Sequence, residues 1–406
     1  MKKLNKNVFV FILVSLFLIG GLISSGFWDN MKNSVKSFIK SDAPIDKKIE
    51  TIIDDIEDIS TKQLSYHDNM LDLNSFVLNK TGTEYVKKNS DVVVKADNDY
   101  LAYGVSKMAD NTLTKYADNI AQLYDYTKQN NIPFLYVMTP QKGYGLKYPA
   151  GTENYIKENC TAHLKNLEER GVPYLEIRQC MEDNNISEEE AFFITDHHWT
   201  PKTAIWATEK ICNELNSRYG FEYDKSVFDL SNYNVKTYED WFLGSQGKKV
   251  GRFFTDLYVD DIDIITPKFD TSLKVSQPLK NETKTGTFEE TLISKVRYEE
   301  KGYYDYNPYV AYTGGDYHIQ TIENLNKTDG KDILVIRDSY AAASTPFLSL
   351  TAHNVHMLDL REMSGMYGDR VASVSEYIEE MQPDYVIVMY YGVNKDDKKY
   401  TFELSK

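Results

Sequence analysis

Apolar and polar positions along the chain follow two patterns, one typical of strands and one typical of helices, which alternate. Compact apolar runs, typical of buried strands, cover residues 132–138, 172–177, 332–337, 354–360 and 385–390, and a shorter β-rich run covers residues 91–94. Segments with helical spacing lie between them, at residues 111–129, 152–170 and 371–381. Strands that alternate with helices form βαβ units, so the pattern predicts an α/β fold with a parallel sheet flanked by helices.

The same patterns divide the chain into five parts. Three lysines precede a charge-free apolar run from Val8 to Phe27, which predicts a signal anchor or transmembrane helix over residues 1–27, because about 20 apolar residues span a bilayer. Residues 28–90 are polar with helical stretches such as 45–59 and are interpreted as a helical stalk. Residues 91–220 and 331–406 carry the α/β pattern, and residues 221–330 are a predicted β-rich insertion.

This organisation predicts a single-pass protein of the cell membrane with its catalytic domain outside the cytoplasm, or a secreted protein if the apolar segment is cleaved. The formal charge of −15 argues against nucleic acid as a partner, because phosphate recognition needs clustered Lys and Arg. Tyrosine is abundant, with 31 Tyr against 4 Trp, which is compatible with sugar binding.

The first candidate site is the segment from Phe192 to Thr203, which contains Asp196, His197 and His198. Thr200 and Pro201 predict a helix start, with Thr200 as the N-cap, so these three residues are expected on the preceding loop. There the Asp196 carboxylate can turn back onto the His198 imidazole and fix its tautomer. Two other interpretations are a structural pair of histidines and a metal site, although adjacent ligands need further donors and no HxxxH or cysteine cluster supplies them.

The second candidate is Ser339, which follows the apolar run 332–337 and precedes an Ala-rich segment. This pattern predicts a serine between the carboxyl end of a strand and the amino end of a helix, where backbone N–H groups can hold an oxyanion. Pro346 predicts that the helix is short or kinked. A plain Ser or Asp cap is the alternative interpretation.

The third candidate follows the last apolar run, at Tyr391, Gly392 and Asn394. Glycine permits a sharp turn at a strand end, and an Asn amide can donate to an oxyanion. Gly365 is a weaker candidate for a backbone donor.

Taken together, these motifs resemble the SGNH hydrolases in a rotated order, with Asp196 and His198 ahead of Ser339 and of the Gly392 and Asn394 pair. That order resembles the alginate O-acetyltransferase subunits and the bacterial DHHW proteins, whose tetrad is matched by residues 196–199. Residues 242–248 and 312–316 also look like landmarks of this family, and the resemblance covers roughly residues 90–400. It implies an SGNH-like, flavodoxin-like fold and a Ser339–His198–Asp196 triad.

The resemblance implies further roles and partners. The expected contacts of an oxyanion or of substrate are Asn394, Gly392, Gly365, His197, Tyr391, Arg337, Trp199, Trp241 and Tyr312. The expected activity is O-acetylation of an exported polysaccharide by way of an acyl-enzyme, without cofactor or metal, beside a membrane-bound O-acyltransferase that supplies the acetyl group. An acetylesterase and a non-catalytic glycan-binding scaffold are the alternatives. A further hypothesis is that aromatic residues of the insertion form a groove that stacks against sugar rings. The alternative for most of these residues is packing in the core. They are Tyr238, Trp241, Phe242, Tyr303, Tyr304, Tyr306, Tyr309 and Tyr312.

Overall fold

The computed structural model describes residues 27–40, 67–88, 90–315, 317–361 and 373–404. The chain divides into two units, residues 1–81 and residues 82–406. In the first unit the described elements are two helices, α2 (Phe27–Lys40) and α4 (His67–Lys80). The predicted anchor and the predicted helix at residues 45–59 lie outside the described residues, apart from Phe27. None of the helices in the described ranges is long and apolar enough to cross a membrane.

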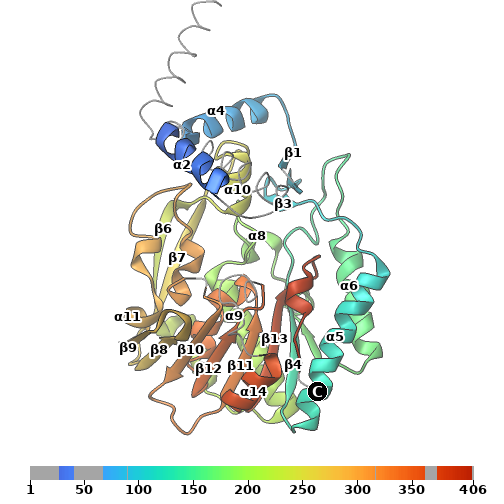
Figure 1. Cartoon of the computed structure of the whole chain (residues 1–406), viewed down its shortest axis with the longest axis vertical. Helices are drawn as coiled ribbons and strands as arrows, with labels where there is room; N and C mark the ends of the chain where they lie inside the picture. The colour runs from blue at the N-terminus through green and yellow to red at the C-terminus, as the bar shows by residue number, and fades with distance from the viewer. Residues whose placement is uncertain (1–26, 41–66, 89, 316, 362–372, 405–406) are drawn as a thin grey trace, which may run out of the picture. The chain divides into compact units, whose positions relative to one another are not determined.

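The second unit is built around a mixed sheet with the strand order β5-β4-β13-β11-β12-β10-β8-β9 (Figure 1). Its parallel part contains β5 (Tyr174–Glu176), β4 (Phe134–Thr139), β13 (Tyr385–Tyr391), β11 (Asp332–Arg337) and β12 (Asn354–Leu358). Each of these strands falls within or beside a predicted apolar run. The expected parallel sheet is therefore present.

The rest of this sheet differs from the expectation, because it is antiparallel and comes from residues 221–330. The strands β8 (Leu273–Gln277), β9 (Glu282–Gly286) and β10 (Ile319–Asn324) continue the sheet beyond β12. A tight connection at residues 278–281 joins β8 to β9 and makes their pairing antiparallel. Lys, Thr and Glu side chains point outward along β9, as is usual at the edge of a sheet.

Two short sheets stand outside this mixed sheet. The predicted strand at residues 91–94 is β2 (Asp91–Lys95), which pairs antiparallel with β1 (Tyr85–Lys88) and β3 (Leu101–Tyr103) and does not join the parallel strands. The strands β6 (Tyr233–Phe242) and β7 (Asp260–Pro267) pair with each other. Three short helices belong to the surrounding loops, namely α8 (Glu188–Ala191), α10 (Ser245–Val250) and α11 (Phe288–Leu292).

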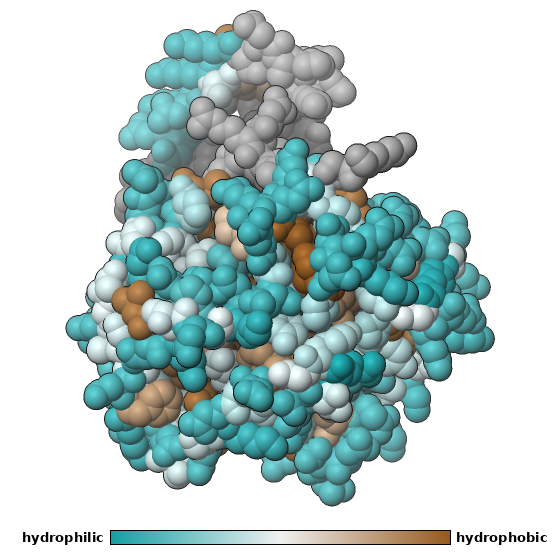
Figure 2. Space-filling model, turned by 90° about the horizontal axis from the view of Figure 1, so that it is seen from below, coloured by the Kyte–Doolittle hydropathy of each residue, from teal (hydrophilic) through white to brown (hydrophobic). Residues whose placement is uncertain are grey.

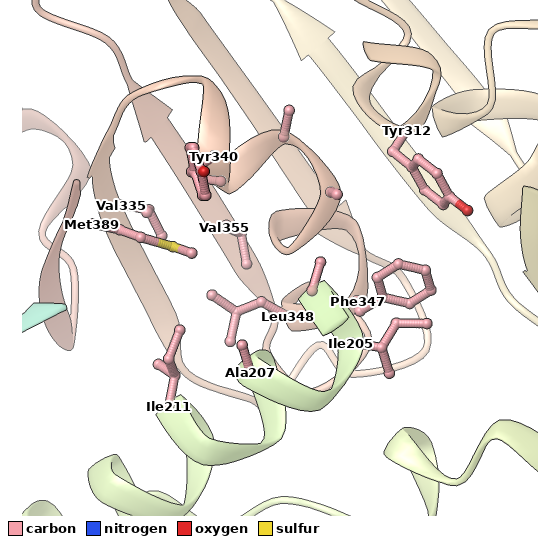
Figure 3. Close-up of a cluster of buried hydrophobic side chains, with 14 of the residues drawn as sticks. Ile205, Ala207, Ile211, Tyr312, Val335, Tyr340, Phe347, Leu348, Val355 and Met389 are labelled. Atoms are coloured by element: carbon pink, nitrogen blue, oxygen red, sulfur yellow. The ribbon is translucent and has the colours of Figure 1, made fainter. Parts of the chain in front are cut away.

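Helices cover both faces of the parallel strands, which explains why these strands read as continuous apolar runs. One face carries α5 (Asp110–Gln129), α6 (Ile156–Glu169) and α14 (Val374–Met381), which pack on residues such as Leu334 and Val386. The other face carries α7 (Ile177–Asp183), α9 (Pro201–Tyr219) and α12 (Thr345–Leu348). Figure 3 shows Ile211 of α9 turned toward Val335 and Met389 of the sheet.

The strand order brings three carboxyl ends together at one edge of the sheet. In the series β4-β13-β11, these ends lead to Gln141, to Tyr391 and to Ser339. Open α/β sheets bind ligands at this edge. The face shown in Figure 2 is mainly hydrophilic, with apolar residues gathered only in small groups.

Candidate active site

Ser339 is the first residue of a short 3-10 helix, residues 339–343, directly after β11. Its neighbours Asp338 and Tyr340 are buried, whereas Ser339 itself is half-buried. The Ser339 Oγ lies 2.9 Å from the Nε2 of His198, a residue 141 positions away in the chain. The fold therefore joins the two motifs that the sequence singled out.

Asp196 holds the other nitrogen of the same ring. Its Oδ1 lies 2.6 Å from the Nδ1 of His198 and accepts the His198 backbone N–H at 2.9 Å. With Nδ1 donating to the carboxylate, Nε2 is left to accept the hydroxyl proton of Ser339. Thr200 caps α9 through its side chain and Pro201 is the first helical residue, as predicted, so the Asp and His stand on the loop before the helix.

The environment of Asp196 keeps its carboxylate ionised. Burial raises the pKa of Asp196, but electrostatic interactions with the His198 and His197 rings and hydrogen bonds from His198 and from the backbone of Ser245 lower it by more. The net pKa lies well below the usual value. The Ser245 N–H donates to Oδ2 at 2.6 Å, so both carboxylate oxygens are engaged.

Aromatic packing orients the His198 ring. Tyr309 stacks on it with a centroid separation of 3.9 Å and an interplanar angle of 15°. The hydroxyl of Tyr309 donates to the backbone O of Tyr340 at 2.9 Å, and the indole N–H of Trp199 donates to the same oxygen at 3.2 Å. These contacts link the His198 ring to the 3-10 helix that carries Ser339.

His197 lies beside the triad. Its Nδ1 is 2.8 Å from the Oγ of Ser245 and 3.6 Å from the Oδ1 of Asp196. Burial and the charge of His198 lower the pKa of His197 to about 3, so this ring is neutral at neutral pH. It lines the cavity next to Ser339 and is available for contact with a substrate.

A cavity of about 770 Å³ opens beside the triad. Ser339, His197, Tyr391 and Asn394 line it, which brings four of the predicted site residues together. The segment 103–109 and the cationic residues Lys249, Arg361 and Lys399 complete much of its wall. Its volume is in the range of pockets for small molecules, which is roughly 300–1,000 Å³.

A buried ion pair forms part of the wall of this cavity. Lys399 Nζ donates to Asp338 Oδ2 at 2.7 Å and to Asn394 Oδ1 at 3.1 Å, and the backbone N–H of Tyr391 donates to the same Asp338 oxygen at 2.8 Å. Burial raises the pKa of Asp338, but the charges of Lys399 and Arg361 outweigh it and lower the pKa to about 2. The pair thus links the serine strand to the turn after β13.

Other predicted contacts lie outside the cavity wall. Arg337, Trp199 and Tyr312 are buried, and Arg337 reaches the carboxylate of Asp359 at 3.5 Å. Trp241, in β6, donates to the backbone O of Tyr298 at 2.7 Å. Gly392 has a φ of +35° at the strand end and packs against Gln141, so its role in this geometry is to form the turn. Gly365 lies outside the described residues.

The hypothetical sugar-stacking groove is not assembled at this cavity. Phe242, Tyr309 and Tyr312 are buried, and Tyr309 stacks on the His198 ring. The tyrosines that do line the cavity are Tyr103, Tyr340 and Tyr391.

Gly244 packs closely against Asp196, and the sequence did not single it out as a residue of the site. A Cβ at that position would lie 2.2 Å from the Cβ of Asp196. The family landmark at residues 242–248 was the available signal.

A metal ion is the alternative occupant of the Asp196, His197 and His198 cluster, since each residue offers a ligand atom and these atoms lie within 4.8 Å of one another. However, both ring nitrogens of His198 are engaged, one with Asp196 and one with Ser339. Both oxygens of Asp196 are engaged as well. The observed hydrogen bonds therefore favour acyl-transfer chemistry over metal binding at this cluster.

Comparisons with known proteins agree with this architecture. Residues 100–239 match the family model described as an SGNH hydrolase-like domain, acetyltransferase AlgX, a range that contains Asp196 and His198 but ends before Ser339. The structure of PatB1 from Bacillus cereus is similar with a TM-score of 0.63 and 22% identity, covering 77% of this chain and 100% of that one. A DHHW family protein from Eubacterium siraeum is similar with a TM-score of 0.58 and 17% identity, covering 79% and 98%.

A search of the curated proteins by sequence finds no significant match. The resemblance to the AlgX-type and DHHW proteins that the motifs indicated is thus confirmed, and the two solved structures show the same fold.

Proposed function

Starting from an SGNH hydrolase-like domain of the acetyltransferase type, we propose that this chain is an exported O-acetyltransferase that modifies a polysaccharide through an acyl-enzyme on Ser339. The observation that carries the proposal is the continuous hydrogen-bonded series from Asp196 through His198 to Ser339. A structural pair of histidines would not require a half-buried serine hydroxyl on the free ring nitrogen, in the wall of a cavity.

The first half-reaction forms the acyl-enzyme. His198 Nε2 takes the hydroxyl proton of Ser339 as Oγ attacks the acetyl carbonyl of the donor, and the ionised Asp196 stabilises the imidazolium. The tetrahedral intermediate collapses when His198 returns that proton to the leaving oxygen. In the second half-reaction, His198 takes the proton of an acceptor hydroxyl as the hydroxyl oxygen attacks the acyl carbon. The bond between the acyl carbon and the Ser339 Oγ then breaks, and His198 returns the proton to Oγ, which regenerates Ser339.

Two groups are suited to stabilise the oxyanion. The backbone N–H of Ser339 stands at the start of the 3-10 helix. The ammonium of Lys399 can only donate hydrogen bonds, so it fixes the oxygen of the Asn394 side chain and leaves the amide NH₂ of Asn394 as a donor on the cavity wall.

The proposal extends to location and partner. The apolar run from Val8 to Phe27 would anchor the chain with its catalytic domain outside the cytoplasm, beside a membrane-bound O-acyltransferase that delivers the acetyl group. Protease added to spheroplasts should then digest the catalytic domain. Complete protection of that domain would contradict the topology, and unchanged surface acetylation after deletion of the acyltransferase gene would contradict the partnership.

One experiment separates transfer from the two alternatives. The purified chain is given a small acetyl ester and a glycan oligomer, and mass spectrometry follows the oligomer in the wild type and in Ser339→Ala. We expect acetylated oligomer from the wild type alone. If the wild type only removes acetate from pre-acetylated oligomer, the chain is an esterase. If the wild type shows neither activity and Ser339→Ala leaves the cellular phenotype unchanged, a non-catalytic scaffold is the better description.

A further inference from the structure

The backbone of residues 194–196, which carries the catalytic carboxylate, is held from both sides by two buried residues of opposite charge. Asp260, at the start of β7, accepts the N–H of Ile194 and, at 2.8 Å, the N–H of Thr195, together with the hydroxyl of Thr195 at 2.5 Å. Lys142, just beyond β4, donates to the carbonyl of Ile194 at 2.8 Å and to the carbonyl of Asp196 at 2.9 Å.

These contacts satisfy nearly every peptide group of a buried loop. The remaining carbonyl, that of Thr195, accepts the N–H of Gly247 at 2.9 Å. Buried peptide groups require partners, and a loop has no regular ladder to provide them. The Ile194 carbonyl also accepts the backbone N–H of Leu101 at 2.9 Å. The other partners are side chains from distant parts of the chain, and both are almost fully buried, at 1% exposure for Lys142 and 3% for Asp260.

A lysine and an aspartate are costly to bury, since each charge loses its hydration. Neither residue is part of the cavity wall. The hydrogen bond from Lys142 to Asp196 is made to the backbone carbonyl of Asp196 and not to its carboxylate. Apolar residues would fill this part of the core without that loss of hydration. The presence of two buried charges is explained if they maintain the geometry of the loop.

We propose that Lys142 and Asp260 are positioning residues that clamp the backbone of residues 194–196 and thereby hold the Asp196 carboxylate against His198. This inference rests on the proposed function and adds to it the device that aligns the triad. Lys142 Nζ also lies 3.3 Å from the Oε1 of Gln246, so its ammonium has an acceptor for each of its three protons.

The clamp makes the alignment depend on pH. Burial lowers the pKa of Lys142, although the charges of Asp260, Asp196 and Glu188 oppose it. Burial raises the pKa of Asp260, although hydrogen bonds from Thr195 and Ile194 and the charge of Lys142 oppose it. The ring of Tyr100 also lies near the Lys142 ammonium, with its centroid 5.4 Å from Nζ. A neutral amine has two protons for three acceptors, so the clamp weakens at alkaline pH.

Global stability changes in the opposite sense. Because the pKa of Lys142 is lower in the folded state, the unfolded chain binds more protons between the two values, and stability from this group rises with pH there. Loss of alignment at alkaline pH is therefore distinguishable from unfolding through the same residue.

The test compares the wild type with Lys142→Met, with Lys142→Arg as the conservative variant and Lys331→Met as the control for loss of a lysine from a surface ion pair. Two readouts are measured on the full-length chain: the rate at which a fluorophosphonate labels Ser339, and the far-downfield proton resonance of His198 Nδ1–H. The second reports the contact of Asp196 with His198 without requiring turnover. A thermal scan of each variant confirms folding.

We expect Lys142→Met to label on the order of 10²-fold more slowly and to lose the downfield resonance, because small misplacements of catalytic groups cost about that much. Lys331→Met should match the wild type. In the wild type, labelling should fall reversibly at a pH below the ordinary lysine range. Lys142→Arg should retain the resonance. Its labelling rate should fall only at a higher pH than in the wild type, since a guanidinium stays charged.

A folded Lys142→Met that keeps both the resonance and the labelling rate would overturn the clamp. If that variant does not fold, the double variant Lys142→Met/Asp260→Asn removes both buried charges together and should show the same loss. If neither variant folds, the pH dependence of the wild-type labelling rate is the test. A labelling rate that stays constant up to the ordinary pKa of lysine overturns the proposal. A wild type that never labels, yet shows the resonance and loses it at alkaline pH, would refute the proposed activity and leave the clamp standing.

Discussion

Replacement of Gly244 by alanine is the substitution whose effect on the triad follows most directly from geometry. An added Cβ would lie 2.2 Å from the Cβ of Asp196, 2.4 Å from its Cα and 2.5 Å from its backbone N, whereas ordinary contacts begin near 3.4 Å. Either Asp196 or the segment around Gly244 must therefore move by about 1 Å. The neighbouring Ser245 N–H, which donates to Asp196 at 2.6 Å, would move with it.

The expected result is a loss of about 10²-fold in kcat, because a displacement of about 1 Å misaligns the base. Overpacking should also cost about 1–3 kcal/mol of stability. The assay is release of p-nitrophenol from p-nitrophenyl acetate, with chemical denaturation to measure the free energy of unfolding. Gly145→Ala is the matched control, since its added Cβ would meet only the ends of the Arg178 and Glu188 side chains. A Gly244→Ala protein with wild-type kcat would show that the close approach of Gly244 to Asp196 does not fix the position of the carboxylate.

Three further predictions follow from the same contacts. Asp196→Asn should lower kcat by about 10⁴-fold without unfolding the chain, because the amide favours the wrong tautomer of His198, and residual activity within tenfold of wild type would count against the triad. Lys399→Met should destabilise the fold by about 3–5 kcal/mol in a denaturant titration, since it leaves the buried Asp338 carboxylate without the ammonium that donates to it. Because the pKa of Asp338 is lowered to about 2, its contribution to stability is present above pH 3.8 and lost as the pH falls toward 2, which acid titration of the unfolding free energy would detect as a decline of about 2 kcal/mol.

The strands that build the sheet were predictable because burial on both faces leaves a plain apolar signal. The run at residues 332–337 coincides with β11, and the capped start of α9 at Thr200 and Pro201 is confirmed. The pairing of β8 and β10 into the same sheet was not predictable. Short polar strands have weak patterns, and their register depends on turns and on the neighbours they find.

The candidate site shows a similar division. Asp196, His198 and Ser339 carry recognisable chemistry in their local sequence, and the structure places them within hydrogen-bond distance. Lys142 lies in a Gly-containing turn, where a lysine ordinarily indicates an exposed charge. Its burial follows from the position of a loop more than fifty residues away, at Ile194, with which it shares no local pattern.

The proposed function requires Ser339 to carry the acetyl group between donor and acceptor. The most direct measurement is acid quenching of the full-length chain during turnover of p-nitrophenyl acetate, followed by mass spectrometry of its peptides. We expect one acetyl group on the peptide that contains Ser339, and its absence from the Ser339→Ala and His198→Ala variants. Turnover that persists in Ser339→Ala, or an acetyl group found only on another residue, would contradict it.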